Sequence, residues 1–350
     1  MAYGIETVTQ DRKALNKAVD RLLEQEGIRR DGSLDYTCAI VDEAGAAVAT
    51  GSCFRNTLRC FAVDHAHQGE GLMNQLLTHL TRVQMDRGNT RLFVYTKTET
   101  ARFFQDLGYH LIAQVPGRVS FLENRRTGFP NFLRGLIQER GKAPRGGAAG
   151  AVVMNANPFT LGHQYLVEQA AVRCDILHLF VVSEDASLVP FDVRWRLVQA
   201  GTACLDNVVL HQTGPYLISS ATFPSYFLKD EALVSRGHAE LDAAVFGEIA
   251  KALGVTLRFL GDEPTSRVTA LYNEVLAERL PAMGVECVVL PRKQSGAQPI
   301  SASTVRQYIH DGKWEELEAM LPETTLAYLR SEEASEVIRA IRDSDTLIHH

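Results

Sequence analysis

Two short polar segments carry the residue types needed to handle the phosphates of a nucleotide. The first, Asn155-Ala156-Asn157-Pro158-Phe159-Thr160-Leu161-Gly162-His163, follows an apolar run and precedes apolar residues at helical spacing. This order predicts a buried strand, a tight turn and the start of a helix. His163 then falls in the first helical turn, where free N–H groups and the helix dipole favour an anion. Gly162 would let the backbone approach a bound ligand closely.

The second segment, Ile300-Ser301-Ala302-Ser303-Thr304-Val305-Arg306, also has the composition of a helix start. Its hydroxyls and the free N–H groups of a first turn can surround the β- and γ-phosphates of a nucleoside triphosphate. Arg306, one turn into the helix, would add charge-assisted hydrogen bonds that can be bidentate. A plain Ser/Thr helix cap is the alternative explanation of this segment taken alone.

The residues around these segments alternate between short apolar runs and longer stretches with helical spacing. Such alternation predicts βαβ units and a parallel, doubly wound, Rossmann-like sheet, because parallel neighbours need a crossover connection. Ligands of such sheets bind at the carboxyl ends of the strands, where Asn155–His163, Gly261–Glu263 and Pro291–Lys293 follow theirs. We expect strands at 151–154, 176–182, 208–211, 256–260 and 287–290, and helices at 162–173, 194–204, 239–253, 268–282 and 303–309.

The first part of the chain predicts a separate α+β domain with its own glycine-rich loop. Residues 11–27 have helical spacing, and helical spacing returns after the loop Gln68-Gly69-Glu70-Gly71. Consecutive N–H groups that glycines expose, beside a helix N-terminus, can hold a diphosphate. We expect strands at 36–41, 46–54, 58–63, 92–96, 109–115 and 119–122, with a further helix at 100–107.

This first part resembles the GNAT acetyltransferase superfamily. The glycine-rich loop matches most of the superfamily's Q/R-x-x-G-x-G/A loop, which binds the pyrophosphate of coenzyme A, and Ala101–Tyr109 resembles a later segment. The resemblance implies that Gln68, Gly69 and Gly71 hold a diphosphate. Met73 stands where the loop has Gly or Ala, and a scaffold that keeps the fold without the chemistry is the alternative.

The second part resembles the nucleotidyltransferase superfamily. Thr160-x-Gly162-His163 matches its (H/T)xGH signature, and residues 300–306 resemble its ISSTxxR motif. The resemblance implies that His163 donates to an α-phosphate oxygen of ATP, with Thr160 and Arg306 as further catalytic residues. Mg²⁺ is expected to bridge phosphate oxygens, and no protein ligand is assigned to it. The residues expected to contact the nucleotide are Asn155, Asn157, Phe159, Gly162, Gly261, Asp262, Ser301, Ser303 and Thr304.

Composition limits the partners and the location. A net charge of −6 gives no general basic field for nucleic acid. The six cysteines are scattered without a Cys-x-x-Cys, which is typical of buried thiols in a reducing compartment. The first residues lack the layout of a signal peptide, and no apolar run approaches the roughly 20 residues needed to cross a bilayer. We expect a cytoplasmic protein without a nucleic-acid or membrane partner.

Glycine, proline and arginine concentrate between the two parts, as is typical of a domain boundary. The sequence therefore predicts a GNAT-like domain at 1–125, a linker at 126–149 and a nucleotidyltransferase domain at 150–330. Residues 331–350 are expected to form a charged, helical and peripheral tail.

The order of the two parts is similar to the citrate lyase ligase family. Further matches are Phe223–Asp230, Gly261–Pro264 and Val268–Asn273, and the resemblance spans roughly residues 10–330. It implies that acetate attacks ATP to give acetyl-adenylate and pyrophosphate. The thiol of a CoA-like prosthetic arm, carried by the acyl carrier protein subunit of citrate lyase, then takes the acetyl group and releases AMP.

Other functions stay open on the residues alone. One is a generic adenylyltransferase that joins AMP to a phosphorylated cofactor precursor. A second is a non-catalytic nucleotide-binding or carrier-binding module. A third is an acetyl-CoA-dependent acetyltransferase, which Met73 disfavours. ATP–pyrophosphate exchange with and without acetate would discriminate best among them.

Overall fold

The structure of the protein is a computed structural model that describes residues 3–141, 147–217, 231–263, 267–296 and 298–344. The expected family segment at 223–230, Pro264 and part of the linker therefore lie outside the described residues. The chain divides into two compact units. One contains Met1–Pro130 with Phe223–Ala244, and the other contains Asn131–Thr222 with Val245–His350.

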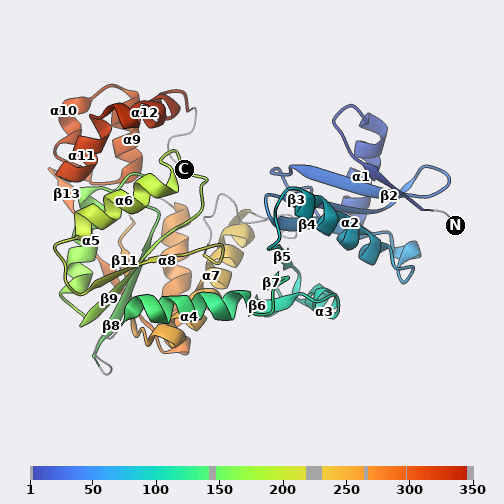
Figure 1. Cartoon of the computed structure of the whole chain (residues 1–350), viewed down its shortest axis with the longest axis horizontal. Helices are drawn as coiled ribbons and strands as arrows, with labels where there is room; N and C mark the ends of the chain where they lie inside the picture. The colour runs from blue at the N-terminus through green and yellow to red at the C-terminus, as the bar shows by residue number, and fades with distance from the viewer. Residues whose placement is uncertain (1–2, 142–146, 218–230, 264–266, 297, 345–350) are drawn as a thin grey trace. The chain divides into compact units, whose positions relative to one another are not determined.

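The first unit is built on one mixed sheet with the strand order β1-β2-β3-β4-β5-β7-β6. Its strands pair antiparallel except β4 and β5, which pair in parallel through Thr57–Phe93 and Leu58–Val94. The apolar side chains of helices α2 and α3 are buried in the hydrophobic core that includes the strands. Figure 1 shows the backbone of these elements. The elements are β1 Gly4–Thr7, α1 Lys13–Gln25, β2 Tyr36–Val41, β3 Ala47–Phe54, β4 Thr57–Val63, α2 Leu72–Asp86, β5 Phe93–Thr96, α3 Ala101–Asp106, β6 His110–Val115 and β7 Val119–Glu123.

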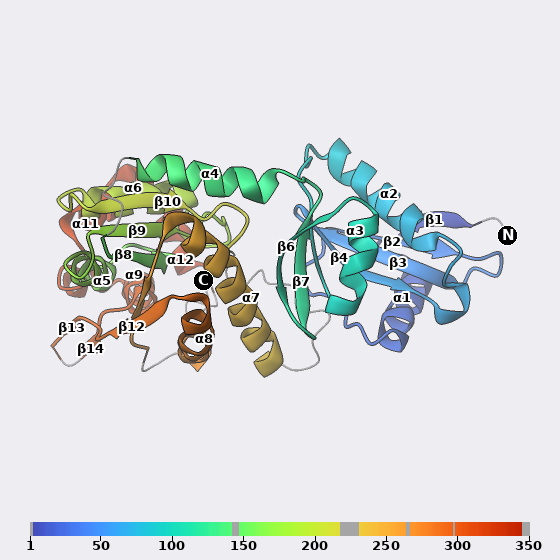
Figure 2. The ribbon, with the colours of Figure 1, turned by 90° about the horizontal axis from the view of Figure 1, so that it is seen from below.

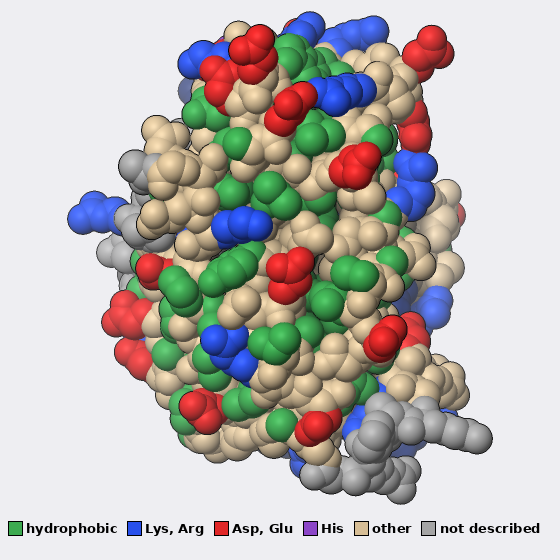
Figure 3. All heavy atoms as spheres, turned by 90° about the vertical axis from the view of Figure 1, so that its left-hand side faces the viewer, with side chains coloured by type: hydrophobic (Ala, Val, Ile, Leu, Met, Phe, Trp, Pro, Cys, Tyr) green, Lys and Arg blue, Asp and Glu red, His purple; other side chains and the backbone are tan. Residues whose placement is uncertain are grey.

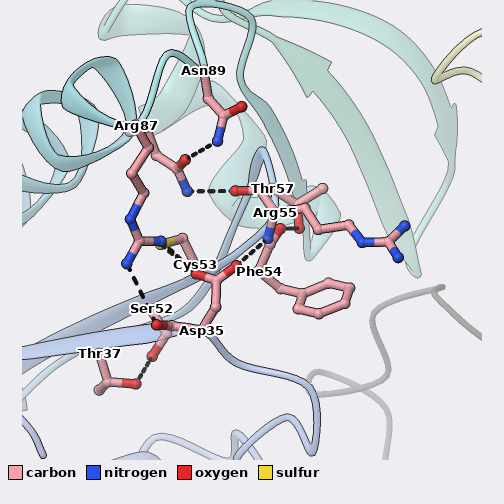
Figure 4. Close-up of polar contacts among 10 residues, drawn as sticks. Asp35, Thr37, Ser52, Cys53, Phe54, Arg55, Thr57, Arg87 and Asn89 are labelled. Atoms are coloured by element: carbon pink, nitrogen blue, oxygen red, sulfur yellow. Dashed lines mark hydrogen bonds and ion pairs between the residues drawn. The ribbon is translucent and has the colours of Figure 1, made fainter. Parts of the chain in front are cut away.

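A polar network fixes the β3–β4 hairpin to the end of α2 (Figure 4). Asp35 accepts from the backbone N–H of Arg55 at 2.5 Å and from the guanidinium of Arg87 at 2.7 Å. Gln84 of α2 donates to the carbonyl of Arg55 at 2.6 Å. These contacts hold Arg55 at a φ of 50°, a backbone region that few side chains adopt. The network therefore stabilises the turn, and it lies at the opposite end of α2 from the glycine-rich loop.

The second unit is built on a parallel sheet with the strand order β10-β9-β8-β11-β12. β8 is buried between two neighbours, which explains its nearly continuous apolar sequence. Helices α5 and α6 pack on one face. On the other face, Phe246 of α7 contacts Phe180, and Glu139 of α4 is hydrogen-bonded to His211. The predicted doubly wound fold is confirmed, and Figure 2 shows its parallel strands along their length.

The helices and strands of the second unit, with the two helices that both units share, are α4 Gly128–Arg140, β8 Ala149–Met154, α5 Leu161–Ala171, β9 Ile176–Val181, α6 Phe191–Thr202, β10 Val208–Gln212, α7 Glu231–Leu253, β11 Leu257–Gly261, α8 Arg267–Arg279, β12 Glu286–Leu290, β13 Gln294–Ser295, β14 Gln298–Pro299, α9 Ala302–His310, α10 Trp314–Leu317, α11 Glu323–Leu329 and α12 Ser335–Arg342.

The end of the described chain packs more closely than the sequence suggested. α12 places Val337 and Ile341 in the same hydrophobic core as α9, with Ile341 fully buried. Charged side chains occupy the other faces of this helix. Its overall composition is therefore polar, although one face is apolar. This helix supports the segment that begins at Ser301.

Charged side chains of both signs lie on the surface. Figure 3 shows acidic, basic and hydrophobic side chains interspersed on one face. Within the described residues, no helix is both long enough and apolar enough to cross a membrane.

Candidate active site

The two predicted polar segments meet at the topological switch point of the parallel sheet. The strand order places β8 at the centre, and the chain winds outward from it in both directions. In such sheets the crevice for a ligand lies outside the carboxyl ends of the two strands at the reversal, here β8 and β11. Asn155–His163 leaves β8 at this edge, and Gly261–Glu263 leaves β11 beside it.

Thr160 and His163 form a reciprocal cap at the start of α5. The hydroxyl of Thr160 accepts from the backbone N–H of His163 at 3.3 Å. In return, the ring Nδ1 of His163 accepts from the backbone N–H of Thr160 at 3.1 Å. Because Nδ1 is an acceptor, the proton of the neutral ring is assigned to Nε2. The cap therefore leaves a single ring N–H as the donor available to a ligand.

His163 is held uncharged. Burial, together with the positive charges of Arg292 and Arg306, lowers its pKa to about 4. The ring is stacked on Phe159 at a centroid distance of 5.9 Å. Phe159 was predicted to contact the nucleotide, but its side chain is fully buried in the hydrophobic core. We therefore assign its ring to supporting His163 instead.

The first turn of α5 keeps one backbone donor for a ligand. The N–H of Leu161 donates to the carbonyl of Met320 at 2.9 Å, and that of Gln164 donates to the carbonyl of Thr160. The N–H of His163 is used by the Thr160 hydroxyl. Among the described residues, the N–H of Gly162 has no partner in this turn.

The two asparagines of the first segment have different environments. Asn155 exchanges side-chain hydrogen bonds with Ser187 and is contacted by Arg194. Asn157 is 2% exposed, and its Oδ1 accepts from the N–H of Val189 at 2.9 Å. That bond orients the amide, and within the described part of the chain its buried Nδ2 has no partner. An orphaned buried donor at this edge suits an anionic or carbonyl oxygen of a ligand.

Arg194 has a structural role beside the first segment. It is fully buried and donates to the carbonyl oxygens of Asn155, Val182, Glu184 and Val189 at 2.7–2.9 Å. The guanidinium thus joins the loop after β9 to the turn after β8. Burial lowers its pKa to about 10, which still leaves it charged at neutral pH.

The second segment forms the predicted helix start. Ser301 caps α9, and its hydroxyl accepts from the N–H of Thr304 at 3.1 Å. The hydroxyls of Ser303 and Thr304 lie 2.9 and 2.7 Å from that of Ser301. Arg306 is only 3% exposed and donates to the carbonyl of Asn157 at 2.6 Å. It therefore connects α9 to the turn after β8.

Gly162 is the point at which the two segments touch. A Cβ added there would lie 2.8 Å from the carbonyl oxygen of Ile300. The sequence explained this glycine by the approach of a ligand, whereas the structure shows the approach of the protein's own backbone. Any larger residue would push the two segments apart.

We predict that Gly162→Ala destabilises the protein by about 1–3 kcal/mol, the usual cost of overpacking. The rate of ATP–pyrophosphate exchange, the activity proposed below for this site, should fall by about 10-fold or more, because the two segments that form the site would be displaced. Thermal unfolding and the exchange rate measure the two effects. Gly135→Ala in α4 is the matched control, because a Cβ there meets nothing within 4 Å. If Gly162→Ala and Gly135→Ala changed the thermal stability and the exchange rate equally, the packing explanation would be wrong.

A third segment borders the site from β11 and β12. Asn273 donates to the carbonyl of Gly261 at 2.9 Å, and the side chain of Asp262 is exposed. Arg292 donates to the carbonyl of Asp262 at 2.6 Å and forms an ion pair with Glu263. The sequence placed Arg292 at this edge but gave it no role. The described residues contain no group of three or more His, Cys, Asp or Glu side chains that could hold a metal.

The chain matches known proteins over both units. A family model described as the citrate lyase ligase C-terminal domain matches residues 149–329, and one described as the acetyltransferase (GNAT) family matches residues 8–109. Citrate (pro-3S)-lyase ligase of Klebsiella pneumoniae is 41% identical over 325 residues, covering 91% of this chain and 93% of that protein. The chain belongs to the citrate lyase ligase family.

Two further family members have the same extent. The protein of the same name from Haemophilus influenzae is 36% identical over 331 residues, covering 93% of this chain and 98% of that protein. The one from Escherichia coli strain K12 is 35% identical over 338 residues, covering 94% of this chain and 95% of that protein. The GNAT-like unit is therefore part of the family's full-length architecture.

In the GNAT-like unit, the loop Gln68–Gly71 has a conformation that requires its glycines. Gly69 and Gly71 have φ values of 88° and 77°, and Gly71 precedes the first residue of α2. A Cβ at either position would meet nothing within 4 Å, so the loop is open to solvent. Met73 packs partly buried against the hydrophobic core of this unit. Its departure from the superfamily pattern therefore has a packing explanation.

Proposed function

We propose that this citrate lyase ligase family member uses ATP to acetylate the thiol of a CoA-like prosthetic arm on the acyl carrier protein subunit of citrate lyase. The observation that carries the proposal is the Thr160–His163 cap, placed at the switch point of a chain that matches a family member over 91% of its length. The alternative adenylyltransferase would use the same cap but a phosphorylated acceptor in place of acetate.

In the first step, a carboxylate oxygen of acetate attacks the α-phosphorus of ATP, and the bond from that phosphorus to pyrophosphate breaks. Charge develops on the non-bridging α-oxygens, and preorganised donors there lower the barrier. The Nε2–H of His163 and the N–H of Gly162 are two such donors on one helix turn. A neutral imidazole donates without first having to lose or gain a proton.

The remaining residues place the substrates. Asn157 offers its buried amide N–H at the same turn. The first turn of α9, with Ser301, Ser303 and Thr304, offers hydroxyls and backbone N–H groups to the β- and γ-phosphates. Mg²⁺ would be held largely by phosphate oxygens and water, with the exposed Asp262 as a nearby carboxylate.

In the second step, the thiol of the arm loses its proton to solvent and its sulfur attacks the acetyl carbonyl. A C–S bond forms, and the C–O bond to AMP breaks. Acetyl-adenylate is therefore formed and consumed without a covalent link to the enzyme.

ATP–pyrophosphate exchange tests the first step. We expect exchange that requires acetate and occurs without the carrier protein. Acetylation of the holo-carrier, read by mass spectrometry, tests the second step. Exchange that ignores acetate and follows a phosphorylated acceptor would overturn the proposal in favour of an adenylyltransferase.

The GNAT-like unit is proposed to bind the internal diphosphate of the carrier's arm through Gln68, Gly69 and Gly71. Gly69→Val or Gly71→Val should spare acetate-dependent exchange and reduce acetyl transfer to the carrier several-fold, because valine cannot adopt the required φ without strain. Gly88→Val is the matched control, since Gly88 lies at the other end of α2 with a φ of 83° and equally open surroundings. If the loop variants lose both steps together, or neither, this division of labour is wrong.

A further inference from the structure

Two arginines lie near His163, and their environments differ. Arg306 is almost completely buried, and its Nη1 donates to the backbone of the Asn157 turn. The side chain of Arg292 keeps 24% of its surface exposed. A buried arginine that donates to a backbone carbonyl typically stabilises the fold. A partly exposed guanidinium at a strand end is accessible to a ligand.

The position of Arg292 follows from the sheet. It comes two residues after β12, and its partners follow β11, the neighbouring strand. The ends of these strands are aligned, since Gly261 pairs with Leu290 in register. β11 also borders β8, from which the His163 segment emerges. Three strand ends thus bring Arg292 to the edge that carries the Thr160–His163 cap.

The electrostatics of His163 agree with this placement. Of the charged groups that lower the pKa of His163, Arg292 has the largest effect and Arg306 the next. A positive charge that acts on the imidazole also acts on an anion bound by that imidazole. Arg292 is therefore within electrostatic reach of the phosphates that His163 would contact.

The guanidinium of Arg292 is held by two partners, and these partners do not occupy all of its N–H donors. Its Nε donates to the carbonyl of Asp262 at 2.6 Å, and its Nη2 pairs with the carboxylate of Glu263, whose side chain is 6% exposed. A guanidinium has five N–H donors, so most remain available. Within the described residues, its Nη1 has no hydrogen-bond partner.

We propose that Arg292, rather than Arg306, is the arginine that contacts the β- and γ-phosphates of ATP, and that Glu263 and the Asp262 carbonyl position it. This inference rests on the proposed use of ATP at this site. A planar fork with free Nη donors matches two phosphate oxygens at once, which a lysine cannot do. Glu263 fixes the orientation of the fork before ATP arrives, so that less side-chain entropy is lost on binding.

The test compares the affinities for ATP and AMP, because AMP lacks the phosphates that Arg292 would contact. By titration calorimetry, Arg292→Gln should weaken ATP binding by about 10–100-fold, the usual effect of losing charge-assisted bonds. AMP binding should stay within about 2-fold. Inorganic pyrophosphate should likewise lose its ability to compete with ATP. Arg330→Gln is the matched control, since Arg330 also pairs with a glutamate but lies 60% exposed at the surface.

Two further variants separate a phosphate contact from a structural role. Arg292→Lys should give an intermediate ATP affinity with AMP unchanged, and it serves as the test if the glutamine variant does not fold. Glu263→Gln should weaken ATP binding less than Arg292→Gln does, again without an effect on AMP. Equal losses of ATP and AMP affinity in Arg292→Gln, or no loss of either, would overturn the assignment.

This test is independent of the identity of the acceptor. If the wild-type protein prefers ATP to AMP but shows no acetate-dependent exchange, the proposed reaction fails and the Arg292 assignment is still decided by the variant. If exchange requires acetate and Arg292→Gln binds ATP normally, the reaction stands and the assignment fails.

Discussion

Replacing His163 with alanine should lower acetate-dependent ATP–pyrophosphate exchange by about 10²–10³-fold, as expected when one preorganised donor is removed. In the proposed reaction the ring donates to the α-phosphate through Nε2, since its Nδ1 is already bonded to the Thr160 N–H at 3.1 Å. The loss should appear mainly in the maximal exchange rate, because the donor strengthens its bond as charge develops on the α-phosphate.

The control for this variant is His310→Ala, in which an exposed histidine of α9 is removed from the far end of the helix. Circular dichroism should show that both variants are folded. A His163→Ala protein with nearly normal exchange would remove this residue from the mechanism.

The pH dependence provides a second check on His163. Its folded-state pKa of about 4 lies below its ordinary value of 6.5, so the folded protein favours the neutral ring. The corresponding stability is fully present above pH 6.5 and is lost as the pH falls toward 4. Exchange should therefore show no ionisation of His163 between pH 6 and 8. An inflection near pH 6.5 that disappears in His163→Gln would contradict this assignment.

Local patterns predicted most of the fold because most elements carry their own signal. The apolar run before Asn155 was predicted as a strand and forms β8, and the helical spacing from Gly162 forms α5. The strand expected at 36–41 coincides with β2. Alternation of such elements was enough to predict the doubly wound sheet, because each crossover helix lies between its two strands in the sequence.

Elements without a local signal were missed. β1 has only four residues, too few to show a clear alternation of apolar and polar side chains. It pairs with β2 along one of its edges. α7 begins at Glu231, whereas a start near 239 was expected. The expected helix covered only the part whose apolar residues recur most densely. α10 and α11 are short helices that were not predicted at all.

Within the candidate active site, contacts between residues close in the sequence have a recognisable spacing, whereas contacts between distant segments do not. Thr160 and His163 are three residues apart, and that spacing is itself the signature of a reciprocal cap. Arg194 bonds carbonyls from two separate loops, and Arg306 bonds a carbonyl 149 residues away. No spacing rule encodes such pairs. Arg292 could have been suspected from its place after a strand at the ligand-binding edge.

The second large effect is expected for Arg306→Lys, which should lower exchange by about 10²-fold and the stability of the protein by about 1–3 kcal/mol. Arg306 donates to the Asn157 carbonyl at 2.6 Å from a nearly fully buried position. Lysine keeps the charge but has a compact ammonium in place of the planar fork, so it cannot reproduce the geometry at a buried carbonyl. The turn that carries Asn157 and the Thr160–His163 cap would then shift relative to α9.

A positioning role for Arg306 has a signature that a phosphate contact does not have. Because the whole turn moves, Arg306→Lys should weaken AMP and ATP binding by similar factors and lower the midpoint of thermal unfolding without ligand. Arg196→Lys is the matched control, since Arg196 is exposed and pairs with Glu333 on the surface. A selective loss of ATP affinity with unchanged thermal stability would instead place the Arg306 guanidinium on the phosphates.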